Sequence, residues 1–168
     1  MLFSEEMELY IPPKKGKSHV LRIIRELIEF RPKNTKTNIA EALKFLSSVM
    51  KKKAIVFMLS DFMDDNYEQT LKIAGKKHDV TGIRVFDKHD VSIPNLGMVN
   101  MLDAETGKSL LVNTASKSVR NSYKEYYLKT VDYFEKSFSH SGSGTISSRI
   151  DENYVKKLLG YFKHKGAR

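Results

Sequence analysis

Two short polar segments of this chain carry side chains that could bind a metal ion or a partner's carboxylate. The first contains Asp61, which follows Ser60 directly after six apolar residues, Ala54 to Leu59. This run is too short and too uniformly apolar for an amphipathic helix, and it predicts a strand covered on both faces, as in a parallel sheet. Ligands of such sheets bind beyond the carboxyl ends of the strands, so Asp61 is a candidate site residue. Alternatively, Asp61 caps a turn or pairs with a lysine.

The second segment is "TNIAEAL", where Thr37 lies at a junction between a loop and a helix. Its hydroxyl is a candidate ligand or hydrogen-bonding group. Spacing alone fits a purely structural role equally well, because Thr37 or Asn38 could cap the helix. Asn38 and Glu41 are three residues apart, as in a capping box.

The composition describes one globular domain over residues 1–168, with 40% apolar and 29% charged residues. The absence of cysteine excludes disulfides, thiolate metal sites and a cysteine nucleophile. No apolar run approaches the roughly 20 residues of a membrane span, and the N-terminus lacks the pattern of a signal peptide. The sequence therefore predicts a soluble, cytoplasmic protein.

The formal charge of +9 raises the alternative of a basic nucleic-acid-binding module. One helical segment mixes basic and aromatic side chains, which suits phosphates and stacked bases. The competing interpretation, which we favour, is an amphipathic helix with its aromatic side buried. The side chains concerned are Arg120, Tyr123, Lys124, Tyr126, Tyr127 and Lys129.

Periodicity and capping signals predict the elements that position these residues. The strand, helix and strand around Asp61 form a right-handed crossover unit of a doubly wound sheet. Asp64 and Asp65 are expected at the start of that helix, where carboxylates suit exposed amides. The expected order begins with a hairpin over 1–13, a helix opened by Ser18 and ended by Pro32, a helix over 39–50, the strand over 54–59, a helix opened by a capping box of Asp65 with Glu68, and a strand over 79–86.

The second half of the chain is expected to add four elements. Apolar runs on either side of residues 103–108 indicate a hairpin with a glycine-containing turn. They are followed by a long helix from about Ser118, a short strand over 145–150, and a final helix capped by Asp151.

Several segments, in order, resemble the domain-of-unknown-function 58 family, which is itself similar to the von Willebrand factor A domain. They are "SEEMELYIPPKKGKSHVLRIIREL", "TNIAEAL", "AIVFMLSDF", "KKHDVTGIRVFDKHDVSIPNLGMVNMLDAETG" and "DENYVKKLLGYF". The resemblance implies an α/β, Rossmann-like, mostly parallel sheet flanked by helices. It also implies a metal-ion-dependent adhesion site that holds Mg²⁺ at the strand ends.

In this resemblance Thr37 matches the family's metal-site threonine, and Asp61 matches the aspartate that closes the site. Asn38, Ser60 and Asp87 are further candidates at the rim of the site. Mg²⁺ prefers octahedral oxygen coordination with one or two carboxylates and several waters, which such a loop set can provide. An open coordination position could then accept a carboxylate from a partner protein.

The chain also departs from the family pattern. The first metal loop, Asp-x-Ser-x-Ser, is absent together with the first central strand, so we expect a truncated domain whose full-length form could bind Mg²⁺. Lys36 replaces the usual glycine and Asn38 the frequent aspartate, which lowers affinity for a cation. We expect no metal, or weak binding, in this fragment. The missing strand should leave the segments 1–3 and 54–59 each without one neighbouring strand. We expect the fragment to compensate either by closing the gap between them or by forming a homodimer through its exposed strands.

The family resemblance implies a non-enzymatic protein-interaction module that works with a MoxR-type AAA+ ATPase in protein assembly. A hydrolase is the third interpretation, since His78, His89 and His140 are potential bases. No nucleophile elbow, metalloprotease helix motif or phosphate-binding glycine loop accompanies them, so we expect no enzymatic activity and no catalytic residue. His78 and Asp87 are expected to hold loops together through hydrogen bonds.

Overall fold

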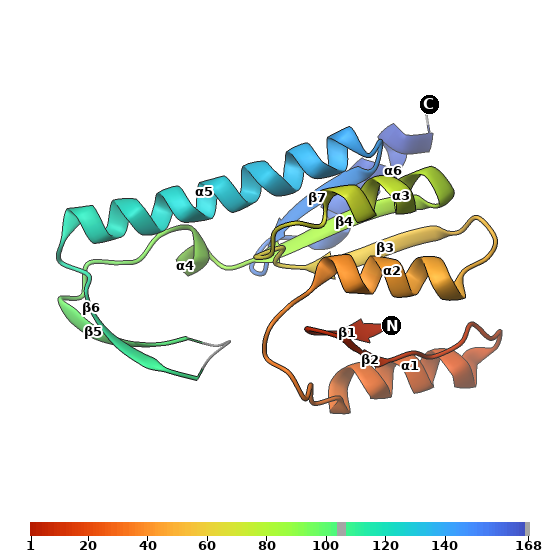
Figure 1. Ribbon diagram of the computed structural model, residues 1–168, viewed down its shortest axis with the longest axis horizontal. Helices are drawn as coiled ribbons and strands as arrows, with labels where there is room; N and C mark the ends of the chain where they lie inside the picture. The colour runs from red at the N-terminus through yellow and green to blue at the C-terminus, as the bar shows by residue number, and fades with distance from the viewer. Residues whose placement is uncertain (104–106, 167–168) are drawn as a thin grey trace.

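The fold is that of a computed structural model which describes residues 1–103 and 107–166 (Figure 1). The predicted elements all occur, with a short extra helix after the second long strand. In chain order they are β1 Leu2–Phe3, β2 Met7–Leu9, α1 Lys17–Glu29, α2 Ile39–Val49, β3 Ile55–Ser60, α3 Glu68–Lys77, β4 Asp79–Phe86, α4 Lys88–Val91, β5 Met98–Leu102, β6 Ser109–Asn113, α5 Lys117–His140, β7 Gly144–Arg149 and α6 Tyr154–Gly166.

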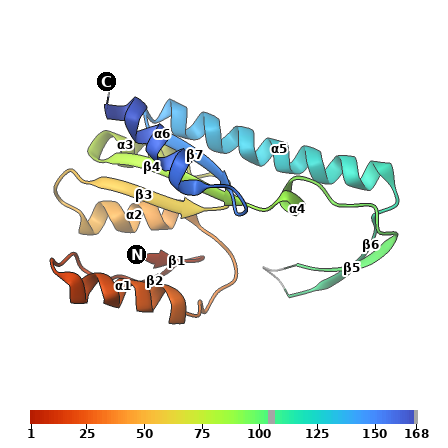
Figure 2. The same ribbon diagram turned by 180° about the vertical axis from the view of Figure 1, so that it is seen from behind.

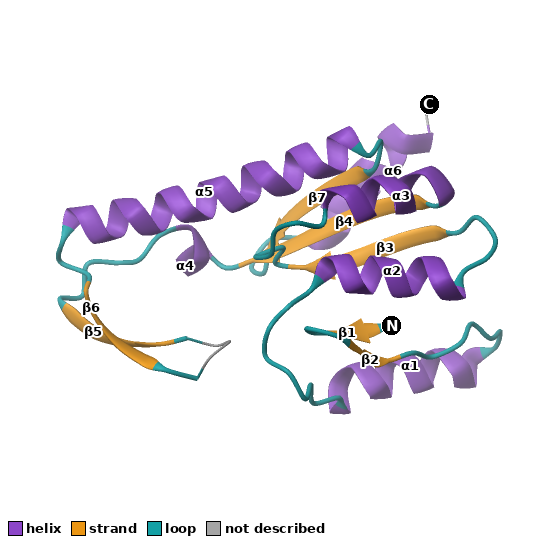
Figure 3. Cartoon of the chain, in the orientation of Figure 1, coloured by secondary structure: helices purple, strands orange, loops and turns teal. Residues whose placement is uncertain are grey.

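The central sheet has three parallel strands in the order β3-β4-β7, with helices on both faces (Figure 3). This arrangement confirms the predicted α/β, Rossmann-like sheet. The expectation that β3 is covered on both faces is wrong for one face. Ile55, Phe57 and Leu59 are 69%, 43% and 61% exposed, whereas Met58, on the opposite face, is buried. On that face α6 reaches β3 through Phe162, whose ring centroid lies 5.8 Å from that of Phe57, and it leaves these side chains largely exposed.

The main core lies on the face of the sheet covered by α2, α3 and α5. Leu43 of α2, Leu71 of α3 and Phe134 of α5 are all fully buried there. α5 approaches β4 closely at Gly82, where an added Cβ would lie 2.6 Å from Phe138. The absence of a side chain at this position therefore lets the two rings of α5 rest on the strand.

On the opposite face, α6 packs beside β7 and reaches across to β4 and β3. The Tyr161 hydroxyl lies 3.0 Å from Thr81 Oγ1, and Lys165 Nζ donates to Asp79 Oδ1 at 2.6 Å. These contacts attach the C-terminal helix to the central strand. They leave most of the β3 face uncovered.

Capping explains which predicted helix starts are correct. Asn38 caps α2, since its side-chain oxygen accepts from Glu41 N at 3.0 Å, as predicted. The prediction that Ser18 opens α1 is wrong. Gly16 precedes that helix without a side-chain cap, and its φ of 109° favours glycine.

Two other predicted caps are also wrong. α3 follows Tyr67, not Asp65, and has no side-chain cap. Its first turn contacts a neighbouring helix instead, because Glu68 N donates to the hydroxyl of Tyr133 at 3.3 Å. At α6 the cap is Asn153, whose Oδ1 accepts from Lys156 N, whereas Asp151 pairs with an arginine.

The hairpin β1–β2 and helix α1 form a separate N-terminal unit below the sheet in Figure 1. As expected, β1 pairs only with β2, and β3 pairs only with β4, among the described strands. The gap between β1 and β3 stays open in this single chain. The hydrogen bond from Asn38 N to Ser4 O, 2.8 Å, helps to join the unit to the rest.

The hairpin β5–β6 and the first half of α5 extend away from the sheet at the other end of the molecule (Figure 2). The hairpin is antiparallel, as predicted, and part of its turn, 104–106, lies outside the described residues. Within the described part of the chain, no helix combines the length and apolar character of a membrane span.

Candidate functional site

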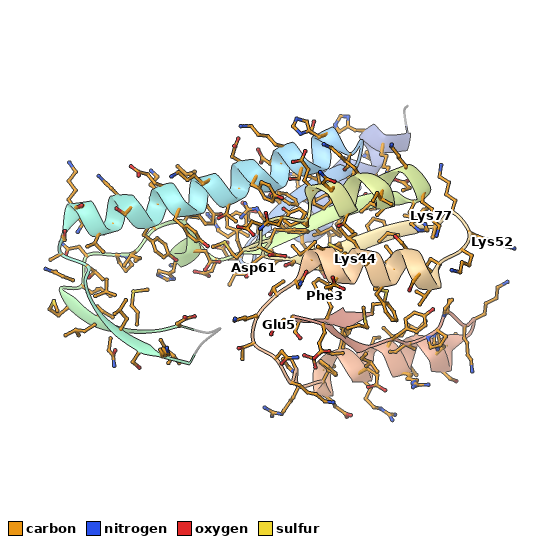
Figure 4. All side chains as sticks on the ribbon, in the orientation of Figure 1. Phe3, Glu5, Lys44, Lys52, Asp61 and Lys77 are labelled. Carbon is orange, nitrogen blue, oxygen red and sulfur yellow. The ribbon has the colours of Figure 1, made fainter. Side chains whose placement is uncertain are left out.

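The carboxyl end of β3 and the amino end of α2 meet at one edge of the sheet, where Figure 4 shows Asp61. Thr37 and Ser60 line the same apolar groove beside β3. Thr37 also lines a second pocket, of about 410 Å³, together with Asp64. The charge of Asp61 contributes to raising the pKa of Asp64, which places these two carboxylates near each other. We call Thr37, Ser60, Asp61 and Asp64 the rim.

The loop after β3 is held by an aromatic residue in an unusual backbone conformation. Phe62 has φ of 57°, in the left-handed region that residues other than glycine rarely adopt. Its side chain is fully buried, with its ring centroid 4.4 Å from that of Phe134 and 5.4 Å from that of Phe138. Packing thus offsets the backbone strain and keeps the preceding Asp61 exposed at the surface.

Asp61 has one carboxylate oxygen available for a ligand. Its Oδ1 accepts from Met63 N at 3.2 Å and from the Ser60 hydroxyl at 3.3 Å. Its Oδ2 has no hydrogen-bond partner among the described residues. Asp61 can therefore accept a hydrogen bond or a positive charge from outside the chain.

Asp64 hydrogen-bonds to the first turn of α2, which contradicts the expectation that it lies at the start of the next helix. Its Oδ2 accepts from Ile39 N at 2.7 Å, and its Oδ1 accepts from Asp65 N at 2.8 Å. Burial is the main influence on its pKa and raises it above the ordinary value, with the two backbone donors acting in the opposite direction. Asp64 thus satisfies a free amide at the start of α2 and joins that helix to the loop after β3.

Glu8 is a site-positioning residue that the sequence analysis missed. Its carboxylate accepts from Lys33 N at 2.8 Å, from Asn34 N at 3.1 Å, and from the hydroxyl of Ser4. The Ser4 hydrogen bond is the main cause of its lowered pKa, followed by the backbone donor of Lys33. Glu8 holds the loop that leads to Thr37. The only signal in the sequence is an acidic residue between two apolar ones in a short strand.

The remaining candidates, Asp87 and His78, take structural roles. Asp87 caps the short helix α4, where it accepts from His89 N at 2.8 Å, and this bond is the main cause of its lowered pKa. These hydrogen bonds lie within residues 87–90, so Asp87 caps a short helix, and its expected role of holding loops together stays a prediction. His78 is buried, and neither ring nitrogen has a partner among the described residues, so its expected loop-holding role is wrong. Burial lowers the pKa of His78.

The rim offers an incomplete donor set for Mg²⁺. The available oxygens are the Thr37 hydroxyl and Asp61 Oδ2, because both Asp64 oxygens and the Ser60 hydroxyl accept backbone amides. Lys36 and Lys129 line the neighbouring pocket and oppose a cation. The described residues contain no cluster of three or more histidine, cysteine or acidic side chains suited to a metal. These residues therefore fit a tightly bound divalent cation poorly.

The aromatic side of α5 is mostly used inside the protein, as the amphipathic interpretation predicts. The buried Tyr127 accepts from Arg84 Nη1 at 2.8 Å, and Tyr123 donates to His89 O at 3.3 Å. Arg120 Nη1 donates to Thr114 O at 2.6 Å. Tyr123 and Tyr127 are thus engaged within the protein, whereas Lys124, Tyr126 and Lys129 are exposed.

Comparison with known proteins gives one family match and several relatives. The model of the family described as "Protein of unknown function DUF58" matches residues 1–131. An uncharacterized protein of Mycobacterium avium is 21% identical over 158 residues, which cover 92% of this chain and 93% of the relative. Uncharacterized proteins of Mycobacterium bovis and Mycobacterium tuberculosis are 27% identical over 100 residues, which cover 58% of this chain and 32% of each relative. No solved structure matches.

Proposed function

Because this chain belongs to the DUF58 family, we propose that it is a non-enzymatic protein-interaction module of the von Willebrand factor A type. The observation that carries the proposal is the meeting of Thr37, Ser60 and Asp61 at the carboxyl end of β3. Ligands of open parallel sheets bind at this edge. An exposed carboxylate beside two hydroxyls can hydrogen-bond to a partner, but it lacks the base and nucleophile pair of a hydrolase.

The partner we propose is a MoxR-type AAA+ ATPase acting in protein assembly, as the family resemblance implies. Asp61 Oδ2 would accept from a basic side chain of the partner, while the hydroxyls of Thr37 and Ser60 donate to or accept from its polar groups. In a longer form that carries the Asp-x-Ser-x-Ser loop, Thr37 and Asp61 would help to hold Mg²⁺. The ion would supply an open coordination position for a partner carboxylate.

A pull-down with the cognate ATPase, with and without Mg²⁺, tests this proposal. We expect the wild-type chain to capture the ATPase and Asp61→Ala to bind it at least roughly 30-fold more weakly, since loss of a central charged contact costs about 2 kcal/mol or more. The matched control is Asp132→Ala, which removes an exposed acid paired with Lys136 on α5. No enrichment in either condition would remove the ATPase as a partner. Equal capture by Asp61→Ala and Asp132→Ala would remove the rim as the contact surface.

A further inference from the structure

A buried guanidinium lies beside the rim with no carboxylate to neutralise it. Arg84 of β4 is only 5% exposed. Arginine is always charged in proteins, and a charged side chain that is removed from water is normally paired with an opposite charge. Arg84 forms no ion pair with any acidic side chain of residues 1–103 and 107–166. Its positive charge is therefore available to an anion from outside the chain.

Strand pairing places Arg84 in one row with two serines. The register pairs Arg84 with Ser60 of β3 on one side and with Ser147 of β7 on the other. Residues paired in this way point to the same face of a sheet, and here it is the face covered by α5. Ser60 ends β3 and belongs to the rim, and Figure 4 shows the next residue, Asp61, at this edge. Arg84 thus lies one strand away from the rim, at the edge where ligands of open parallel sheets bind.

Hydrogen bonds and aromatic rings hold the guanidinium in place. Its Nη1 donates to the hydroxyl of Tyr127 at 2.8 Å, and its Nε donates to Ser147 Oγ at 3.3 Å. Its Cζ lies 4.2 Å from the ring centroid of Phe86 and 5.5 Å from that of Tyr127. Such contacts with ring faces stabilise the charged side chain. Because the guanidinium is already fixed, a ligand that binds it meets a smaller loss of side-chain entropy.

Two hydrogen-bond donors remain free around this guanidinium. Nη2 of Arg84 has no hydrogen-bond partner within the part of the chain that the structure describes, and protein atoms do not fully enclose it. The Tyr127 hydroxyl accepts from Arg84 and so keeps its own hydrogen to donate. Both donors adjoin Nη1 of Arg84. The two oxygens of one carboxylate can therefore accept from them together.

The surrounding charge favours a carboxylate over a phosphate group. Asp61 directly follows Ser60 at the end of β3, and Asp87 directly follows β4. Their negative charges oppose a dianion about twice as strongly as a monoanion at the same distance. The net charge of +9 attracts anions to the chain as a whole. A single carboxylate is therefore the anion that fits this place best.

We infer that Arg84 and Tyr127 bind the carboxylate of an aspartate or glutamate side chain of the partner protein. The carboxylate accepts from Arg84 Nη2 and from the Tyr127 hydroxyl, while Phe86 and Ser147 hold the guanidinium. This inference rests on the interaction function proposed above and adds a second contact to it. The partner surface then presents a basic side chain to Asp61 and an acidic one to Arg84.

Propionate, which is the glutamate side chain without its backbone, provides the probe in NMR titrations of the full chain at constant ionic strength. Propionamide is the neutral control ligand, and inorganic phosphate is the competing anion. The Nε–H signal of Arg84 is the readout, because this buried group is hydrogen-bonded to Ser147. We expect a saturable shift with propionate, weaker binding of phosphate, and no shift with propionamide.

The site variants are Arg84→Met and Tyr127→Phe. Replacing a buried charge by an apolar side chain of similar size is often neutral or stabilising, so Arg84→Met should fold. Tyr127→Phe keeps the packed ring and removes only the hydroxyl. With the backbone amide of Ser147 as the readout, we expect Arg84→Met to lose propionate binding and Tyr127→Phe to weaken it at least about 10-fold.

Arg149→Met is the matched control, because it removes the same charge from the end of the neighbouring strand. Arg149 is half-exposed and already pairs with Asp151. This variant should bind propionate like the wild type. Equal losses in Arg84→Met and Arg149→Met would reduce the effect to net charge and overturn the inference. No saturable shift with propionate, or tighter binding of phosphate than of propionate, would also overturn it.

The Asp61→Ala variant separates this inference from the proposed function. It should bind propionate like the wild type while it captures less ATPase, whereas Arg84→Met should lose both. Propionate binding without ATPase capture by any variant would retain the Arg84 site and reject the ATPase as partner. ATPase capture that depends on Asp61, without any propionate binding, would retain the rim and reject the Arg84 site.

Discussion

Two carboxylates near the rim accept hydrogen bonds from backbone amides with both oxygens, and a third leaves one oxygen free. Glu8 and Asp64 use their oxygens on amides of the segment around Thr37, and Asp61 leaves one oxygen free. The pKa of Glu8 is lowered, mainly by hydrogen bonds, whereas the pKa of Asp64 is raised, mainly by burial. The difference arises because Glu8 receives three donors at the surface, whereas Asp64 is partly removed from water.

The opposite shifts make pH a probe of this segment. The folded-state pKa of Glu8 lies below its ordinary 4.5, so its stabilising contribution is present above 4.5 and is lost as pH falls through the lowered value. We expect the amides of residues 33–38 to exchange faster, relative to the core, as the pH is lowered through that range. Glu8→Gln should show the faster exchange already at neutral pH and should weaken its pH dependence. Hydrogen exchange with mass spectrometry at a series of pH values measures this.

Glu5→Gln is the matched control, because Glu5 lies in the turn of the hairpin that carries Glu8 and is exposed. It should leave exchange over 33–38 unchanged at every pH. Asp64 acts in the opposite direction, since an acid with a raised pKa loses stability as pH rises through the interval above its ordinary 3.8. A segment that becomes better protected in acid would therefore show that Asp64 outweighs Glu8.

Single residues could be predicted from the sequence where the signal was local. Asp61 follows an apolar run that marks the end of a strand, and Asn38 precedes Glu41 at capping distance, so both positions are visible in the sequence. Asp64 and Glu8 hold amides 25 and 26 residues away in the chain, at Ile39 and Asn34. No pattern in a single sequence indicates such pairs, because they depend on the finished tertiary structure.

Helices and strands follow from hydrophobic periodicity, but their starts depend on neighbours. The spacing of apolar residues predicts the positions of α2, β3, β4 and α5, and in the structure these apolar residues contribute to the packing of the elements. The start of α3 was misplaced because Asp65 is exposed and Glu68 N donates to Tyr133 of α5. The face of β3 was misjudged because the run Ala54–Leu59 is apolar on both sides while only α2 and part of α6 cover it.

Close contact between β4 and α5 makes Gly82 a sensitive backbone position of the sheet. An alanine Cβ there would lie 2.6 Å from Phe138 and 2.8 Å from Phe134, and both rings are fully buried. Neither ring can move without disturbing the core, so Gly82→Ala should lower the free energy of unfolding by about 1–3 kcal/mol. Urea denaturation followed by circular dichroism measures the change.

Gly160 of α6 provides the control for Gly82. A Cβ at Gly160 would meet no atom within 4 Å, and the residue lies inside a helix. Gly160→Ala should therefore raise stability by about 0.5–1 kcal/mol through helix propensity alone. A loss of stability in Gly160→Ala, or no loss in Gly82→Ala, would contradict the packing of α5 and α6 described above.

At the scale of the whole molecule, burial is concentrated in the middle. α2, α3 and the second half of α5 share one core over β3 and β4, while α1 has no buried residue. The apolar residues of α1 and of the β5–β6 hairpin are instead largely exposed. The sequence indicated an incomplete sheet, but not that the hairpin β1–β2 would stay unpaired with β3, because that depends on contacts such as the hydrogen bond from Lys33 N to Glu8.

This distribution predicts two levels of protection in hydrogen exchange. Amides of β4 and α3 should exchange slowest, because opening them exposes the shared core, and those of α1 and of β5–β6 should exchange at least about 10-fold faster. Uniform protection of α1 and β4 in the free chain would mean that α1 is already covered in solution, and sedimentation would then distinguish a second copy from a closed monomer.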